Sequence, residues 1–132
     1  MKHFFYVLLF CSLVFVGCGE TDGPHPEQVA AHAAKVYYDA LLQGHYDQFV
    51  DGRYQPDSIP QGYRDQLITN AKMFVGQQQE EHRGITAVRI TDAKADTVKH
   101  VADVYLTLVY GDSTKEQIVV PMVEEKGVWY LR

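Results

Sequence analysis

The sequence predicts an α+β fold in which N-terminal helices pack on an antiparallel sheet of about four strands. Apolar residues recur at spacings of three and four in the first half of the chain, and they alternate with polar residues from Gly84 onward. Helices followed by a meander of strands are typical of α+β domains, since a parallel sheet requires alternating strands and helices. At 132 residues the chain has room for one domain, which we place at residues 26–132.

The amino-terminal residues have the pattern of an export signal. Lys2 and His3 provide a short basic start, and an apolar stretch follows at residues 4–16. This stretch is shorter than the roughly 20 residues needed to span a bilayer, and it has the length of a signal-peptide core. We therefore expect a signal peptide at residues 1–17.

Cys18 is the candidate lipidation site. Gly17-Cys18 followed by abruptly polar sequence resembles the lipobox of bacterial lipoproteins, in which the cysteine is acylated and becomes the first residue. The only other cysteine, Cys11, lies inside the signal, so Cys18 would have no disulfide partner after processing. The alternative is an ordinary secretory signal in which Cys18 is incidental. We expect a lipidated Cys18 and a polar tether at residues 18–25, with the membrane as partner through the lipid anchor.

Three helices are expected before the strands. The first begins at Pro26, ends at the cap residue Gly44, and should bury the face formed by Val29, Ala33, Val36, Tyr37, Ala40 and Leu41. A short second helix is expected at residues 45–50 and a loop at residues 53–62. A long third helix should run from about residue 61 to 82, with an apolar face formed by Tyr63, Leu67, Ala71, Phe74 and Val75.

Four strands follow in a meander. The first has alternating residues from Thr86 to Ile90 and should end in a turn at residues 92–96. The second is long, with one alternating face formed by Val98, His100, Ala102, Val104, Leu106, Leu108 and Tyr110. The third carries Ile118, Val120 and Met122, and the fourth spans residues 128–131. We expect Val104, Leu106 and Leu108 to pack on Val36, Ala40 and Phe74, and we expect Trp129 to be a buried structural residue.

Two segments carry a family resemblance. The turn Leu41-Leu42-Gln43-Gly44-His45-Tyr46-Asp47-Gln48-Phe49 and the end Lys126-Gly127-Val128-Trp129-Tyr130-Leu131 resemble those of small bacterial lipoproteins of the nuclear-transport-factor-2-like superfamily, including lumazine-binding-like domains of unknown function. The resemblance implies a cone-like fold, a curved sheet around helices with a cavity at its open end. Its members include enzymes, such as ketosteroid isomerase and scytalone dehydratase, as well as non-catalytic binding modules, so the fold alone does not decide the function.

Several kinds of chemistry lack the residues they need. The formal charge of −5 argues against a nucleic-acid partner, which requires excess Lys and Arg. Neither a zinc-binding spacing of Cys and His nor a glycine-rich phosphate loop is present in the sequence. Neither Ser58 nor Ser113 lies in a Gly-x-Ser-x-Gly motif. We therefore expect no metal and no cofactor.

The remaining site candidates are Tyr37, His100 and Tyr110. His100 lies on the expected apolar strand face, where an imidazole could act as a base in a cavity, although no Asp or Glu shares that face. Tyrosines such as Tyr37 and Tyr110 suit a pocket with one dry and one wet end. We hypothesise a non-catalytic module that binds a small apolar ligand or an envelope protein; the alternative is a cofactor-free isomerase or dehydratase that uses His100. The resemblance to bacterial lipoproteins also implies a location. In enterobacterial lipoproteins an Asp after the acylated cysteine is the signal for retention in the inner membrane; Gly19 follows Cys18 here, so we expect an outer-membrane location.

Overall fold

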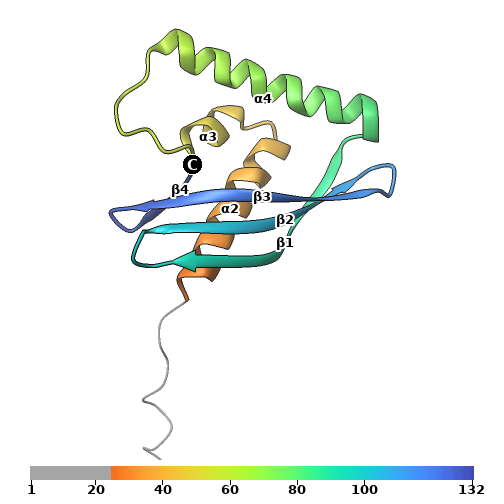
Figure 1. Cartoon of the computed structure of the whole chain (residues 1–132). Helices are drawn as coiled ribbons and strands as arrows, with labels where there is room; N and C mark the ends of the chain where they lie inside the picture. Colours follow the sequence, from red (N-terminus) through yellow and green to blue (C-terminus); the bar gives the residue numbers. More distant parts are fainter. Residues whose placement is uncertain (1–24) are drawn as a thin grey trace, which may run out of the picture.

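The computed structural model describes residues 25–132; the predicted signal peptide and Cys18, and the tether up to residue 24, lie outside the described residues. Within this range the order of elements is α2 (Pro26–Leu42), α3 (Tyr46–Asp51), α4 (Gln61–His82), β1 (Ile85–Asp96), β2 (Val101–Tyr110), β3 (Lys115–Glu125) and β4 (Val128–Leu131) (Figure 1). The strands form one antiparallel sheet in the order β1-β2-β3-β4, which confirms the predicted α+β fold. In residues 25–132, no helix is both long and apolar enough to cross a membrane.

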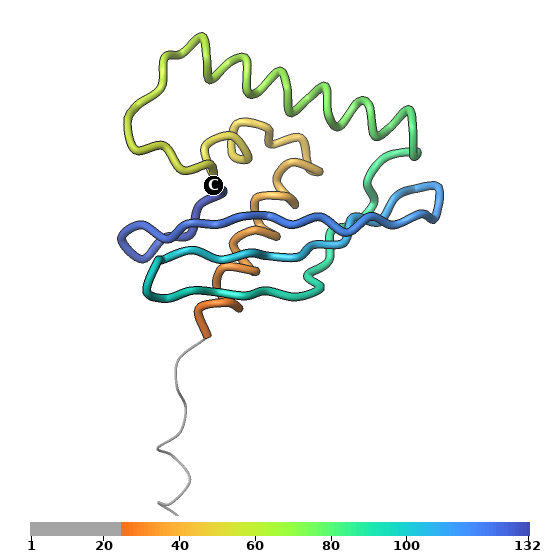
Figure 2. Tube along the Cα trace, viewed as in Figure 1, coloured from red at the N-terminus to blue at the C-terminus, as the bar shows by residue number. Residues whose placement is uncertain are grey.

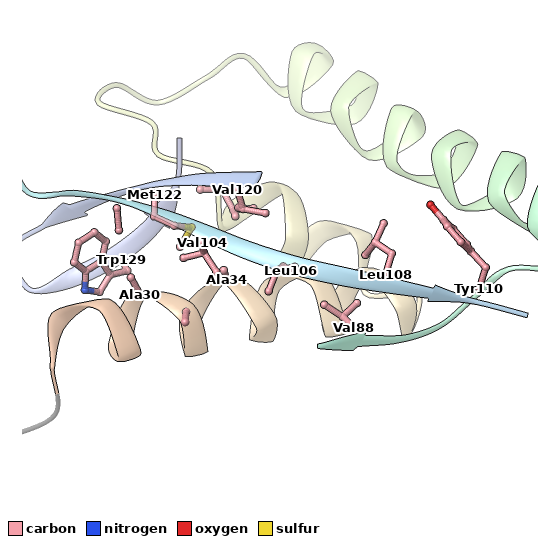
Figure 3. Close-up of a cluster of buried hydrophobic side chains, with 13 residues drawn as sticks. Ala30, Ala34, Val88, Val104, Leu106, Leu108, Tyr110, Val120, Met122 and Trp129 are labelled. Atoms are coloured by element: carbon pink, nitrogen blue, oxygen red, sulfur yellow. The ribbon is translucent and has the colours of Figure 1, made fainter. Parts of the chain in front are cut away.

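The hydrophobic core lies between α2 and one face of the sheet. Figure 2 shows α2 crossing this face, and Figure 3 shows the buried side chains between them. Alternate residues of β2 are buried there, as the sequence predicted, together with residues of the neighbouring strands. The sheet contributes Val88, Ala102, Val104, Leu106, Leu108, Tyr110, Val120, Met122, Trp129 and Leu131 to the core.

None of the three predicted packing partners on the helices belongs to the core cluster that contains Val104, Leu106 and Leu108. Ala40 is buried, but Val36 and Phe74 are 49% and 37% exposed. The face of α2 that meets the sheet core carries Ala30, Ala31 and Ala34 instead. Alanine side chains are short, so they let the helix backbone approach the sheet closely while the larger strand residues fill the space. The bulkier valines of α2 therefore face outward.

The predicted start of the long strand is also wrong. β1 continues to Asp96, and β2 begins only at Val101, so residues 97–100 form the turn between them. The Asp96 carboxylate accepts hydrogen bonds from the backbone N–H groups of Val98 and Lys99, at 3.0 and 3.1 Å. Such a contact from Asp to the following backbone stabilises a turn. Val98 is 86% exposed, and His100 has a left-handed φ of 56°, which takes both residues off the strand face.

The last strand closes the core at the other edge of the sheet. Gly127, which precedes the short β4, has a φ of 80°, a conformation that favours glycine. Trp129 is 5% exposed, whereas its neighbour Val128 is 46% exposed. The Tyr37 hydroxyl donates a hydrogen bond of 2.7 Å to the backbone oxygen of Trp129, which ties α2 to β4. The prediction that Trp129 is buried is confirmed.

Helix α4 has the predicted bounds but lies apart from the sheet (Figure 1). Of its 22 residues only Ala71 is buried, and Tyr63 on its expected core face is 52% exposed. Near its start, Arg64 donates two hydrogen bonds of 2.9 Å to the Asp51 carboxylate. At its end, the His82 ring lies 3.0 Å from the Asp112 carboxylate. The helix is therefore held at both ends and has little packing along its middle.

Candidate functional site

A cavity of about 530 Å³ lies between α4, α3 and the sheet. The residues that line it are mostly apolar and come from every helix and from three strands. They are Tyr38, Leu41, Phe49, Val50, Leu67, Ala71, Phe74, Leu108, Ile118, Val119, Val120, Pro121 and Leu131. Four polar residues complete the lining, namely Arg53, Asn70, Glu116 and Arg132.

The inner wall of the cavity is held by α2 and α3. The rings of Tyr38 and Phe49 meet edge to face, with their centroids 5.3 Å apart. This arrangement is favoured because the positive edge of one ring faces the negative face of the other. Burial raises the pKa of Tyr38, so its hydroxyl stays neutral at physiological pH. These aromatic residues make this wall predominantly apolar.

One end of the cavity is built where the chain leaves α3. The backbone N–H of Leu131 donates to Gly52 O at 2.8 Å, and the N–H of Tyr54 donates to Leu131 O at 2.6 Å. Gly52 is required at this point, because a Cβ there would lie 2.4 Å from the Tyr37 ring. These contacts fix Arg53 beside Leu131 and so bring Arg53 and Arg132 to the same end of the cavity.

The opposite end is formed by Glu116 and the residues around it. The Tyr110 hydroxyl donates to the Glu116 carboxylate at 2.5 Å, and the Tyr110 ring stacks on His82 with centroids 4.3 Å apart. Figure 3 shows Tyr110 at the α4 end of the buried cluster. Burial, together with the hydrogen bond to Glu116, raises the pKa of Tyr110 to about 12. Glu116 is therefore engaged by a hydroxyl that stays protonated at physiological pH.

Asp112 connects this end of the cavity to the end of α4. Its carboxylate accepts hydrogen bonds from the hydroxyl and the backbone N–H of Thr114, at 2.5 and 3.0 Å, and contacts His82. The contacts with Thr114, followed by that with His82, lower the pKa of Asp112 to about 2. The ion pair with His82 requires the imidazole to be protonated, whereas the hydrogen bonds from Thr114 do not.

The three residues predicted from the sequence lie apart from one another, and none of them lines this cavity. Tyr37 is half-buried beneath β4, where its hydroxyl is used by Trp129. Tyr110 lies behind Glu116 at the end of β2. His100 lies in the β1–β2 turn with its side chain 60% exposed, and its Nδ1 is 3.0 Å from the Glu124 carboxylate. The sequence shows no Asp or Glu on the expected strand face of His100; in the structure its partner Glu124 comes from the neighbouring strand β3.

The helix residues that line the cavity from α4 are ones that the sequence predicts to be core. Leu67, Ala71 and Phe74 have the spacing of a buried helix face, which does not distinguish a helix packed on the sheet from one that leaves a space beneath it. The sequence predicts a loop at residues 53–62, and no local pattern there gives Arg53 a role. Across residues 25–132, no group of three or more His, Cys, Asp or Glu residues is arranged to hold a metal ion.

Comparisons with known proteins give information about the fold. Neither a protein-family model nor a curated protein sequence matches the chain. The crystal structure of an NTF2-like transpeptidase from Campylobacter jejuni is similar, with a TM-score of 0.61 and 10% identity over 76% of this chain and 94% of that chain. A solution structure of a SEC-C motif containing protein from Rhodopseudomonas palustris has a TM-score of 0.51 and 14% identity, and covers 78% of this chain and 76% of that one. The chain therefore has the nuclear-transport-factor-2-like fold that the resemblance implied.

Proposed function

We propose that this protein is a non-catalytic module of the cell envelope that binds a small, mainly apolar ligand in the cavity beneath α4. The observation that carries the proposal is the cavity itself. Its volume of about 530 Å³ is within the range of small-molecule sites, about 300–1,000 Å³. Its lining combines many apolar residues with a few polar ones, which is the usual composition of such sites. A concave space of this kind suits a small ligand better than the flat surface of a partner protein.

The positions of the titratable groups favour binding over the alternative of an isomerase or dehydratase. A general base must lie within about 3 Å of the proton that it removes, and His100 lies outside the cavity. The carboxylate in the lining, Glu116, already accepts the hydrogen bond from Tyr110. The residues that line the cavity can contact a ligand, but they include no histidine that could act as a base.

A neutral fluorescent probe, N-phenyl-1-naphthylamine, tests the proposed cavity. We expect its fluorescence to rise on binding, and Ala71→Phe to reduce its affinity about tenfold or more, because the new ring occupies the space between α4 and the sheet. Thr69→Phe is the matched control, since Thr69 is exposed on the same helix and does not line the cavity. Circular dichroism establishes that both variants are folded. Equal affinity in Ala71→Phe and the original protein, or no binding of the probe at all, would overturn the proposal.

The envelope location rests on the Gly17-Cys18 pattern. Two acyl chains hold a protein at a bilayer stably, so acylation of Cys18 would place the domain close to the membrane, which we take to be the outer membrane. Labelling cells with a radioactive fatty acid should mark the original protein and not Cys18→Ser. Equal labelling of the two proteins would show that Cys18 is not the anchor.

A further inference from the structure

The polar residues at the α3–β4 end of the cavity are cationic, although the chain as a whole is acidic. Lys and Arg number 12 against 17 Asp and Glu, yet this end carries Arg53 and Arg132. The backbone places the two arginines close together, because Arg53 forms an isolated β-bridge with Leu131 and Arg132 is the residue after Leu131. Cationic groups at one end of an apolar cavity favour a ligand with a negative charge at one end.

Two acidic side chains, one close to Arg53 in the sequence and one in the cavity lining, are already engaged. Asp51, two residues before Arg53, accepts both hydrogen bonds of Arg64, which hold its pKa below the ordinary value. Glu116, the carboxylate within the cavity lining, is bonded to Tyr110. Among residues 25–132, the ion pairs present include neither Arg53 nor Arg132. The two guanidinium groups are therefore available to an anion from outside the chain.

From this geometry we infer that the ligand is an amphipathic anion, with a carboxylate held by Arg53 and Arg132 and an apolar chain lying beneath α4. The inference rests on the proposed binding function and specifies its ligand class. A guanidinium group presents two parallel N–H donors that match the two oxygens of a carboxylate. The apolar chain would extend past Leu67 and Phe74 of α4 toward Leu108 of β2, all of which line the cavity. Glu116 at the far end would disfavour a second negative charge there.

Two probes with the same apolar chain, one anionic and one neutral, distinguish the contribution of the charge to binding from that of the apolar cavity. Dodecanoate and dodecanol carry the same apolar chain, and only dodecanoate is anionic at pH 7.5. We expect dodecanoate to bind the full-length protein at least tenfold more tightly than dodecanol, measured by displacement of N-phenyl-1-naphthylamine, because charged hydrogen bonds are worth more than neutral ones. Raising the salt concentration should weaken the binding of dodecanoate and leave that of dodecanol unchanged.

The decisive variant is Arg53→Gln, with Arg89→Gln as its control. Both lose one positive charge from an exposed position, but Arg89 lies on β1, at the opposite edge of the sheet from β4. We expect Arg53→Gln to weaken dodecanoate about tenfold without affecting dodecanol, Arg53→Lys to weaken it less, and Arg89→Gln to affect neither probe. The double variant Arg53→Gln/Arg132→Gln should bind the two probes equally.

The outcomes distinguish this inference from the function on which it rests. If the original protein binds both probes with equal affinity, or if Arg89→Gln weakens dodecanoate as much as Arg53→Gln, the anionic ligand class is wrong while the apolar cavity stands. If neither probe binds and N-phenyl-1-naphthylamine does not bind either, the proposed binding function itself fails.

Discussion

Replacement of Leu106 by alanine should destabilise the protein more than most single substitutions. Leu106 is fully buried at the middle of β2, where it is paired with Ile90 on β1 and Ile118 on β3. It belongs to the core cluster that packs on Ala34 of α2. Neighbours on every side leave little freedom for the structure to collapse into the space that the substitution creates.

The size of the effect follows from the atoms removed. Leu106→Ala deletes three buried carbon atoms, which at ~0.8 kcal/mol each amounts to about 2.4 kcal/mol of lost transfer free energy. A remaining cavity of about 50 Å³ would add about 1.2 kcal/mol, at ~24 cal/mol per Å³. We therefore expect the free energy of unfolding to fall by about 3.5 kcal/mol, within the range of about 2–5 kcal/mol measured for such changes.

Urea unfolding followed by circular dichroism measures this loss. With a denaturant dependence of about 1.5 kcal/mol per molar urea, the midpoint should fall by roughly 2 M. Val109→Ala is the control, because Val109 lies on the other face of the same strand and is only half-buried; its cost should be about 1 kcal/mol or less. A loss below about 0.5 kcal/mol for Leu106→Ala, which is typical of surface positions, would refute the assignment of this strand face to the core.

Three further predictions concern named contacts. Because the pKa of Asp112 is lowered to about 2 in the folded protein, its stabilising contribution is complete above about pH 4 and is lost as the pH falls toward 2. Urea unfolding at pH 5 and pH 2.5 should therefore show a smaller acid-induced loss of unfolding free energy for Asp112→Asn than for the original protein. Trp129 fluorescence should be blue-shifted and poorly quenched by acrylamide; emission near that of free tryptophan would contradict its burial. Tyr37→Phe removes the hydrogen bond to Trp129 and should lower the free energy of unfolding by about 1 kcal/mol, measured by thermal or urea unfolding. An unchanged midpoint would contradict a stabilising role of that bond.

The strands and helices could largely be predicted from the sequence, because their patterns are local. The alternation from Ala102 to Tyr110 indicated which face of β2 is buried, and the Gly127 turn indicated where β4 begins. The turn at residues 97–100 was missed because Val98 continues the apolar alternation, while the Asp96 carboxylate stabilises a turn there. Alternation alone does not show where such a side-chain contact interrupts a strand.

The site was harder to predict, because it depends on the distance between elements. Hydrophobicity predicts a face of α2 that includes Val36 and leaves out Ala30, Ala31 and Ala34; close packing on the sheet buries these three alanines instead. The apolar face of α4 looked like core, and only the three-dimensional arrangement shows the space beneath Phe74. Arg53 gains its position from a bridge to Leu131, 78 residues later in the chain, and no local pattern reports such a contact.

The attachment of α4 at its two ends divides the protein into parts that can change independently. The core between α2 and the sheet supplies the stability of the fold without contributions from Met73 or Phe74, which are 66% and 37% exposed. Backbone amides in the middle of α4 should therefore exchange with solvent through local opening, at a lower free energy than those of β2. Substitutions along this helix can alter the width and shape of the cavity at little cost to folding. If the cavity binds a ligand as proposed, its preference can change through substitutions in this one helix.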